Sequence, residues 1–158
     1  MEINILVSVR SVLDEVAQKA GYTAVKRVPD PNMEGDDGAY DRVTTVDEDE
    51  AELMQFFGEC RSWLALEFSD MLVKEGMDAE NEDSYGLMLN VNDGFNIALL
   101  PSLQLSLFNY FVYGILYRWF MYTRKEESDG YAALSASMLD GIKKYTLRRT
   151  YERKTRPF

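Results

Sequence analysis

The chain has 158 residues, 46% of them apolar, which is enough for one domain with a buried core and leaves little room for a second. It contains no histidine and a single cysteine, Cys60. Histidine-based acid–base catalysis, His/Cys zinc sites and disulfide frameworks are therefore excluded within one chain, and the composition is typical of an intracellular protein.

The formal net charge of −10 is unevenly distributed along the chain. Residues 1–100 carry 22 Asp and Glu against 7 Lys and Arg, a balance of −15, whereas residues 101–158 carry 5 acids against 10 bases. An acidic body argues against wrapping nucleic acid over a broad surface. It suits contact with a basic partner, or with the basic end of a neighbouring copy.

The first predicted element is a helix that ends at Ala20, because apolar residues from Val9 onward recur at helical spacing and Gly21 is a natural terminator. The β-branched run at residues 5–7 leaves a short strand open at the start. A long acidic loop is predicted over residues 24–44, which at this length is typical of a functional or partner-bound segment. Within it, residues 30–41 partly imitate a calcium-binding loop, but Asp41 is too short for the bidentate ligand, so we expect no metal there.

A long helix is predicted over residues 45–76. Thr45 and Glu48 form a capping box, apolar residues follow at steps of three and four, and Gly76 ends the pattern. Cys60 lies within the apolar stripe, which favours a small buried side chain over a reactive thiol.

A β-hairpin is predicted over residues 84–100, after an acidic loop at 77–83. Tyr85–Val91 is the first strand, Asn92-Asp93-Gly94 the tight turn and Phe95–Leu100 the returning strand.

The next predicted helix, residues 101–125, is aromatic on nearly every side, and Pro101 suits its first turn. A helix that is apolar all round must be covered all round. We therefore expect its outer face to contact a neighbouring subunit, rather than the whole helix to be intramolecular core, with Tyr113, Tyr117 and Phe120 as contact residues. The uncharged stretch 95–117 is long enough to cross a bilayer, but its polar residues share one helix face, so a membrane span is disfavoured.

The last predicted elements are a helix over residues 128–146 and an extended basic arm over residues 147–158. The arm can add a strand to a partner chain or dock on an acidic surface. As a DNA-binding arm it would instead contact phosphates. We favour a protein partner, and the candidate contact residues are Arg148, Arg149, Tyr151, Arg153, Lys154, Arg156 and Phe158.

The sequence thus predicts a single domain, 1–158, of mainly α class. It is a bundle of about four helices with a small β-hairpin and an extended C-terminal arm. Phosphate-binding and hydrolase motifs such as GxxxxGK[ST], GxGxxG and GxSxG do not occur. We therefore predict a protein that is not an enzyme and has no catalytic residue, cofactor or metal.

Several short segments recur in one known pattern: Ala-Tyr-Asp-Arg at 39–42, Leu-Met-Leu-Asn-Val at 87–91, the aromatic segments 109–112 and 117–120, and Thr-Arg-Pro-Phe at 155–158. Together they resemble the small neck proteins of tailed bacteriophages, the head–tail connector or adaptor group, including prophage copies. The resemblance implies a mostly helical virion subunit in the neck, repeated about twelve times in a ring. It also implies assembly in the host cytoplasm, contact with portal and other neck or tail proteins, and DNA passing through without sequence-specific binding.

Two other function classes remain open. One is a small nucleic-acid-binding regulator that uses the basic arm, and the other is a small membrane-associated protein built on residues 95–117. Particle mass in solution separates a ring subunit from a regulator that binds DNA as a monomer or dimer.

Overall fold

The computed structural model describes residues 1–27 and 49–152, with side chains described for residues 1–21 and 49–147. These parts of the chain are mostly helical, with one small antiparallel sheet, which confirms the predicted fold class. In chain order the elements are β1 (Glu2–Ser8), α1 (Val9–Arg27), α3 (Glu50–Glu67), β2 (Leu72–Met77), β3 (Ser84–Asn90), a 3₁₀ turn (Ile97–Leu99), α4 (Leu100–Phe120) and α5 (Lys125–Glu152).

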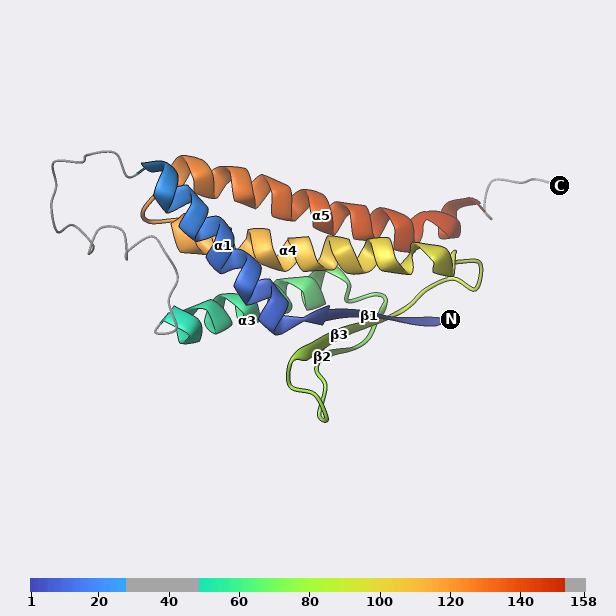
Figure 1. Ribbon diagram of the computed structural model, residues 1–158. Coiled ribbons are helices and arrows are strands. Elements are labelled where there is room, and N and C mark those ends of the chain that lie inside the picture. The colour runs from blue at the N-terminus through green and yellow to red at the C-terminus, as the bar shows by residue number, and fades with distance from the viewer. Residues whose placement is uncertain (28–48, 153–158) are drawn as a thin grey trace, which may run out of the picture.

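The sheet has the strand order β1-β3-β2, with both pairs antiparallel. Side chains alternate between its two faces, as the period of two in a strand requires. The face toward the helices is apolar and largely buried, with pairs such as Ile5 with Leu87 in β1–β3 and Met77 with Tyr85 in β2–β3. The opposite face is not covered by a described helix (Figure 1).

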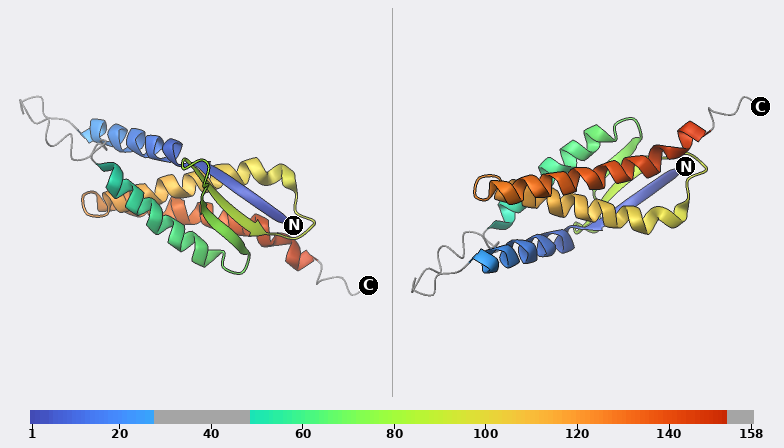
Figure 2. Two further views of the ribbon diagram at one scale, coloured as in Figure 1. Left: turned by 90° about the horizontal axis from the view of Figure 1, so that it is seen from below. Right: turned by 90° about the horizontal axis from the view of Figure 1, so that it is seen from above.

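Helix α4 is the centre of the fold. It packs along α5 on one side and against α1, α3 and β1 on the other (Figures 1 and 2). Its apolar residues are therefore shared among all the layers. An aromatic cluster marks the junction: Phe111 of α4 stacks on Phe57 of α3 with ring centroids 4.4 Å apart and meets the Tyr85 ring of β3 edge-on at 5.1 Å.

The first turn of α1 is capped by a residue from far along the chain. The Asp83 carboxylate, in the β2–β3 loop, accepts hydrogen bonds from the Ser8 hydroxyl at 2.8 Å and the Arg10 backbone N–H at 2.7 Å. The bond from Arg10 satisfies one of the N–H donors that a helix leaves free at its start, and the two bonds together hold the pKa of Asp83 below its usual value. The cap ties the β2–β3 loop to the β1–α1 junction.

The helix predicted over residues 45–76 is shorter than expected. α3 ends at Glu67, and residues 72–77 form β2, in which Gly76 adopts a φ of +143°. The helical spacing of apolar residues continued past the true end because Met71 also packs on the core, although from the turn that follows α3. The capping box at Thr45 and Glu48 and the acidic loop from residue 28 onward lie outside the described residues.

Three further predictions need correction. The strand at residues 5–7, left open, is part of β1, and the helix that follows continues through Gly21 to Arg27. Residues 95–100 do not return as a strand, because they form the 3₁₀ turn and the start of α4, while β3 pairs with β1 and β2. The arm is not extended from residue 147, since α5 remains helical to Glu152.

Candidate functional site

The three contact residues predicted on α4 do not form one exposed face. Phe120 is completely buried and stacks on Tyr131 of α5 at 6.0 Å, so its ring is covered within the chain, in contrast to the outward position expected for a subunit contact. Tyr113 is half-buried and stacks on the same ring at 6.0 Å, and Tyr117 is half-buried under the Arg118 guanidinium. The chain covers most of its aromatic helix by itself.

The predicted basic arm is split by the end of α5. Arg148, Arg149 and Tyr151 belong to the last turns of that helix, and their side chains lie outside the described residues. Residues 153–158, which include Arg153, Lys154, Arg156 and Phe158, also lie outside them.

Helix α4 meets the test of length and apolarity for a membrane span. The segment Ile97–Phe120 is the one that does so in the part of the chain that the structure describes, and 44% of its 18-residue apolar stretch is buried inside the fold. The prediction that this segment does not cross a membrane rested on polar positions that share a helix face. Here the same helix is the one on which α5, α1, α3 and the sheet all pack.

A partly buried polar cluster joins α3 to α4 and α5 around Cys60. The Arg118 guanidinium donates to the Glu59 carboxylate at 2.8 Å and to the Gly114 carbonyl at 3.0 Å. The Tyr110 hydroxyl donates to the Cys60 carbonyl at 2.8 Å, and the Ser135 hydroxyl donates to the Tyr110 carbonyl at 3.1 Å. The groups in these bonds are paired with one another, so the cluster holds the three helices together.

Burial raises the pKa of the Cys60 thiol to about 11. Few thiolates are therefore present at neutral pH, and the sulfur is fully covered. This agrees with the predicted role of a small buried side chain.

We expect Cys60 of the native protein to react with a thiol reagent at pH 8 at least about a hundredfold more slowly than an exposed cysteine, from the shift in pKa alone. The same protein in guanidinium should release one thiol at the ordinary rate, because Cys60 is the only cysteine in the sequence. Rapid labelling of the native protein would show that this part of the core opens readily.

A second polar group lies between α3 and the sheet. The Arg61 guanidinium makes two hydrogen bonds to the Glu75 carboxylate of β2, at 3.1 and 3.2 Å, and lies over the Tyr85 ring. Burial, with the Glu75 charge nearby, raises the pKa of the Tyr85 hydroxyl, which has no hydrogen-bond partner at normal geometry. A neutral hydroxyl beside a paired guanidinium offers neither a base nor a nucleophile at neutral pH.

The outer face of the sheet holds a shallow concavity of about 380 Å³. Gly76 and Gly86 are paired across β2 and β3 and leave its floor low, while Asn4, Lys74 and Met88 stand around it. The sequence analysis missed this surface because it placed residues 72–77 in a helix and left β1 undecided. The surface could have been predicted from the alternation of residues along 2–8 and 84–90, in which every second side chain belongs to the outer face of the sheet.

The outer surfaces of the helices carry exposed apolar side chains that the sequence analysis also missed. Trp63 and Leu66, three residues apart on α3, are 53% and 69% exposed, and Tyr122, just after α4, is 91% exposed. Apolar exposure that is grouped on one helix face is typical of contact surfaces. We define Trp63 and Leu66 as the α3 patch.

No group of His, Cys, Asp and Glu residues that could hold a metal ion occurs within residues 1–27 and 49–152. The calcium-like loop at residues 30–41 lies outside the described residues. The chain matches no protein-family model, no curated protein sequence and no solved structure.

Proposed function

We propose that the chain is a structural subunit of a tailed-bacteriophage neck, a head–tail connector or adaptor that acts by assembling into a ring in the virion. The observation that carries the proposal is the α3 patch, where Trp63 and Leu66 are neighbours on the exposed face of one helix. Tryptophan is enriched among the residues that dominate the energy of protein interfaces. The polar clusters described above support the same role, because their groups hold the helices together.

The charge distribution supports a protein partner over broad contact with nucleic acid. The acidic balance of residues 1–100 repels phosphate, whereas the basic excess lies near the end of α5 and beyond it. In this proposal the portal and other neck or tail proteins are the partners, and DNA passes through the ring without being read. The proposal includes no cofactor, no membrane and no enzymatic activity.

A nucleic-acid-binding regulator remains the second candidate. The observation in its favour is that α5 stays helical to Glu152, which places Lys144, Arg148 and Arg149 on a helix. A basic helix can contact a DNA backbone or groove.

We expect Trp63→Lys to shift the concentration at which the purified chain assembles upward by roughly tenfold or more, as truncation of an interface hot spot does. Helix content and the urea midpoint should stay near those of the parent, because Trp63 is not in the buried core. The measurement is particle mass by analytical ultracentrifugation, with negative-stain images to reveal rings.

The matched control is Gln55→Lys, which adds the same charge at another exposed position of α3. A parent chain that stays a monomer or dimer and binds duplex DNA with a steep salt dependence would contradict the neck proposal and favour the regulator. Equal assembly of Trp63→Lys and Gln55→Lys would show that the α3 patch does not contribute to assembly.

A further inference from the structure

The strand β1 is an edge strand with an open side. The order β1-β3-β2 pairs β1 with β3 only, and no further strand flanks it in the described parts of the chain. An open edge exposes a row of backbone N–H and C=O groups, which can template pairing with another chain.

The register identifies the groups that point to the open side. Val91 N–H donates to the Met1 carbonyl at 2.7 Å and Val9 N–H donates to the Asp83 carbonyl at 2.8 Å, so the odd-numbered residues of β1 form the hydrogen-bonded pairs with β3. Bonding alternates along an antiparallel pair. The N–H and C=O groups of Glu2, Asn4 and Leu6 therefore point away from β3, on the side where no described strand pairs with β1.

This edge lacks the features that usually protect edge strands. β1 has seven residues in regular register with β3, without a bulge, proline or lysine, and Leu6 on its outer face is 46% exposed. The other edge strand, β2, is interrupted by a register shift between Leu72 and Lys74 and by Gly76 at a φ of +143°. Strand addition is therefore favoured at β1 over β2.

We propose that the open edge of β1 receives residues 153–158 of a second copy of this chain as an added antiparallel or parallel strand. The inference rests on the proposed function, because it names the contact that joins neighbouring subunits. The occupant is a short segment rich in positive charge, with Arg153, Lys154 and Arg156. Main-chain hydrogen bonds to Glu2, Asn4 and Leu6 supply the pairing.

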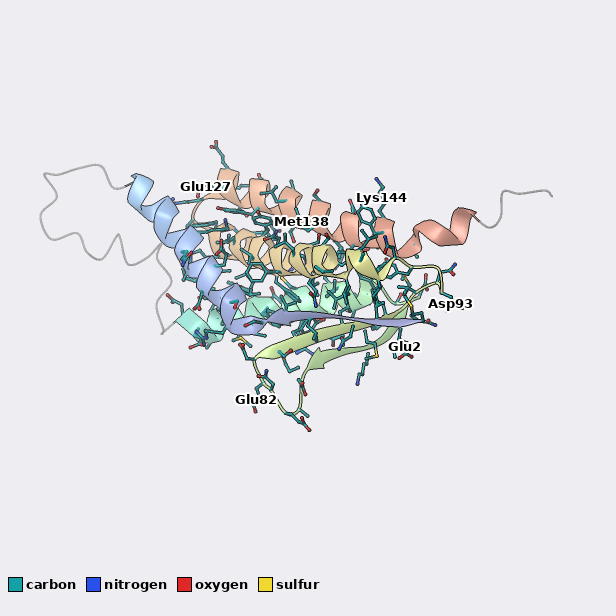
Figure 3. All side chains as sticks on the ribbon, turned by 45° about the vertical axis from the view of Figure 1, so that its right-hand side comes forward. Glu2, Glu82, Asp93, Glu127, Met138 and Lys144 are labelled. Carbon is teal, nitrogen blue, oxygen red and sulfur yellow. The ribbon has the colours of Figure 1, made fainter. Side chains whose placement is uncertain are left out.

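Charge complementarity supports this occupant. Glu2 lies on β1 itself, and Asp93, 88% exposed, lies beside the start of the strand, where its carboxylate pairs with the Met1 amine at 3.1 Å (Figure 3). Asp83 lies at the other end of β1, bonded to Ser8. A carboxylate therefore lies near each end of the edge, and the edge belongs to a body whose first 100 residues have a balance of −15.

The position of α5 favours a second copy over the same chain. α5 ends at the same end of the molecule at which β1 begins, in every view, and its axis points away from the body there (Figures 1 and 2). Six residues span at most about 20 Å when extended. Pairing with β1 of the same chain would require them to reverse direction within that length, whereas a neighbour's segment arrives from outside.

The test uses Asn4→Pro in the full chain. Proline removes the Asn4 N–H that points to the open edge and keeps the β1–β3 hydrogen bonds, which is why proline is tolerated on edge strands. The matched control is Asn4→Ala, which removes the same side chain but keeps the N–H. A chain that lacks residues 153–158 tests the other half of the contact.

The readouts are particle mass by analytical ultracentrifugation and the binding of a fluorescent peptide of residues 149–158 to the shortened chain. We expect Asn4→Pro and the shortened chain to lose assembly while Asn4→Ala keeps it. We also expect the peptide to bind the shortened chain about tenfold or more weakly once Asn4→Pro is present. Circular dichroism and urea unfolding check that each variant is folded.

The outcomes separate this inference from the proposed function. Rings that persist in Asn4→Pro or in the shortened chain would overturn the inference and leave the neck proposal standing. A dimer, rather than a ring, that both changes abolish would support the inference and contradict the ring. If Asn4→Pro unfolds, the shortened chain and the peptide decide, and a peptide that does not bind the shortened chain overturns the inference. If Asn4→Pro folds, a peptide that binds Asn4→Ala as weakly as Asn4→Pro overturns it.

Discussion

Phe111→Ala should lower the free energy of unfolding by about 3–5 kcal/mol, the usual cost of removing a large buried aromatic side chain. Phe111 is completely buried where α4, α3 and β3 meet. Its ring stacks on Phe57 and meets Tyr85 and Tyr110 edge-on, so alanine leaves a cavity bounded by three other rings. A domain of this size has a total stability of about 5–15 kcal/mol, so the loss should move the urea midpoint strongly.

The measurement is urea unfolding followed by circular dichroism at 25 °C. Tyr122→Ala is the matched control, because Tyr122 is an aromatic residue near the end of the same helix but is almost fully exposed, and its loss should change stability by less than about 0.5 kcal/mol. Phe111→Leu gives a measurable intermediate if the alanine variant does not fold. Similar midpoints for Phe111→Ala and Tyr122→Ala would contradict the central position of α4.

Local signals predicted the helices better than the strands. Pro101 falls in the first turn of α4, as expected, because a proline there removes no intrahelical hydrogen bond. The turn at Asn92-Asp93-Gly94 is also real: Phe95 N–H donates to the Asn92 carbonyl at 2.8 Å, and Gly94 N–H donates to the Asn92 side chain. The prediction was wrong about the segment after the turn, where Asn96 caps a 3₁₀ turn that leads into α4.

The partners of β3 could not be read from its neighbours in the sequence. Residues 84–90 pair with residues 2–8, more than seventy positions earlier, and with residues 72–77, whose apolar spacing also fitted a helix. Non-local pairing is decided by which strands bury a common face, and a single sequence does not state that directly. The candidate edge on β1 was missed for the same reason.

The burial of α4 was misjudged because four elements of one chain share it. The sequence shows an apolar stripe on every side of α4, and covering such a helix within 158 residues looked difficult. The structure covers α4 by placing α5 along one side and α1, α3 and β1 along the other. Gly114 lies where α3, α4 and α5 meet, with Cys60 of α3 and Ser135 of α5 beside it.

Gly114→Ala should destabilise the fold by about 1–3 kcal/mol, the usual cost of overpacking, although alanine is the better helix former. A Cβ added at Gly114 would lie 2.8 Å from Cys60 Sγ of α3 and 3.3 Å from Ser135 Oγ of α5. Both distances are shorter than ordinary contacts, so these buried side chains, or the helices that carry them, must shift. Gly58→Ala is the matched control within α3: a Cβ there meets no atom within 4 Å, so the same substitution should stabilise by about 0.5–1 kcal/mol.

The double variant Cys60→Ala/Gly114→Ala tests the cause of that loss. Cys60→Ala removes the sulfur that the new methyl group would meet, and the methyl then occupies part of the space that the sulfur leaves. The two changes should therefore cost less together than the sum of the single variants, by about 0.5–3 kcal/mol of coupling. Urea unfolding of all four chains in this cycle measures the coupling free energy.

Additive costs, or a Gly114→Ala variant as stable as Gly58→Ala, would mean that α3 and α4 do not meet as closely at Gly114 as the fold requires. The polar cluster around Arg118 and Tyr110, whose partners include Gly114 and Cys60, would then not be what joins these helices.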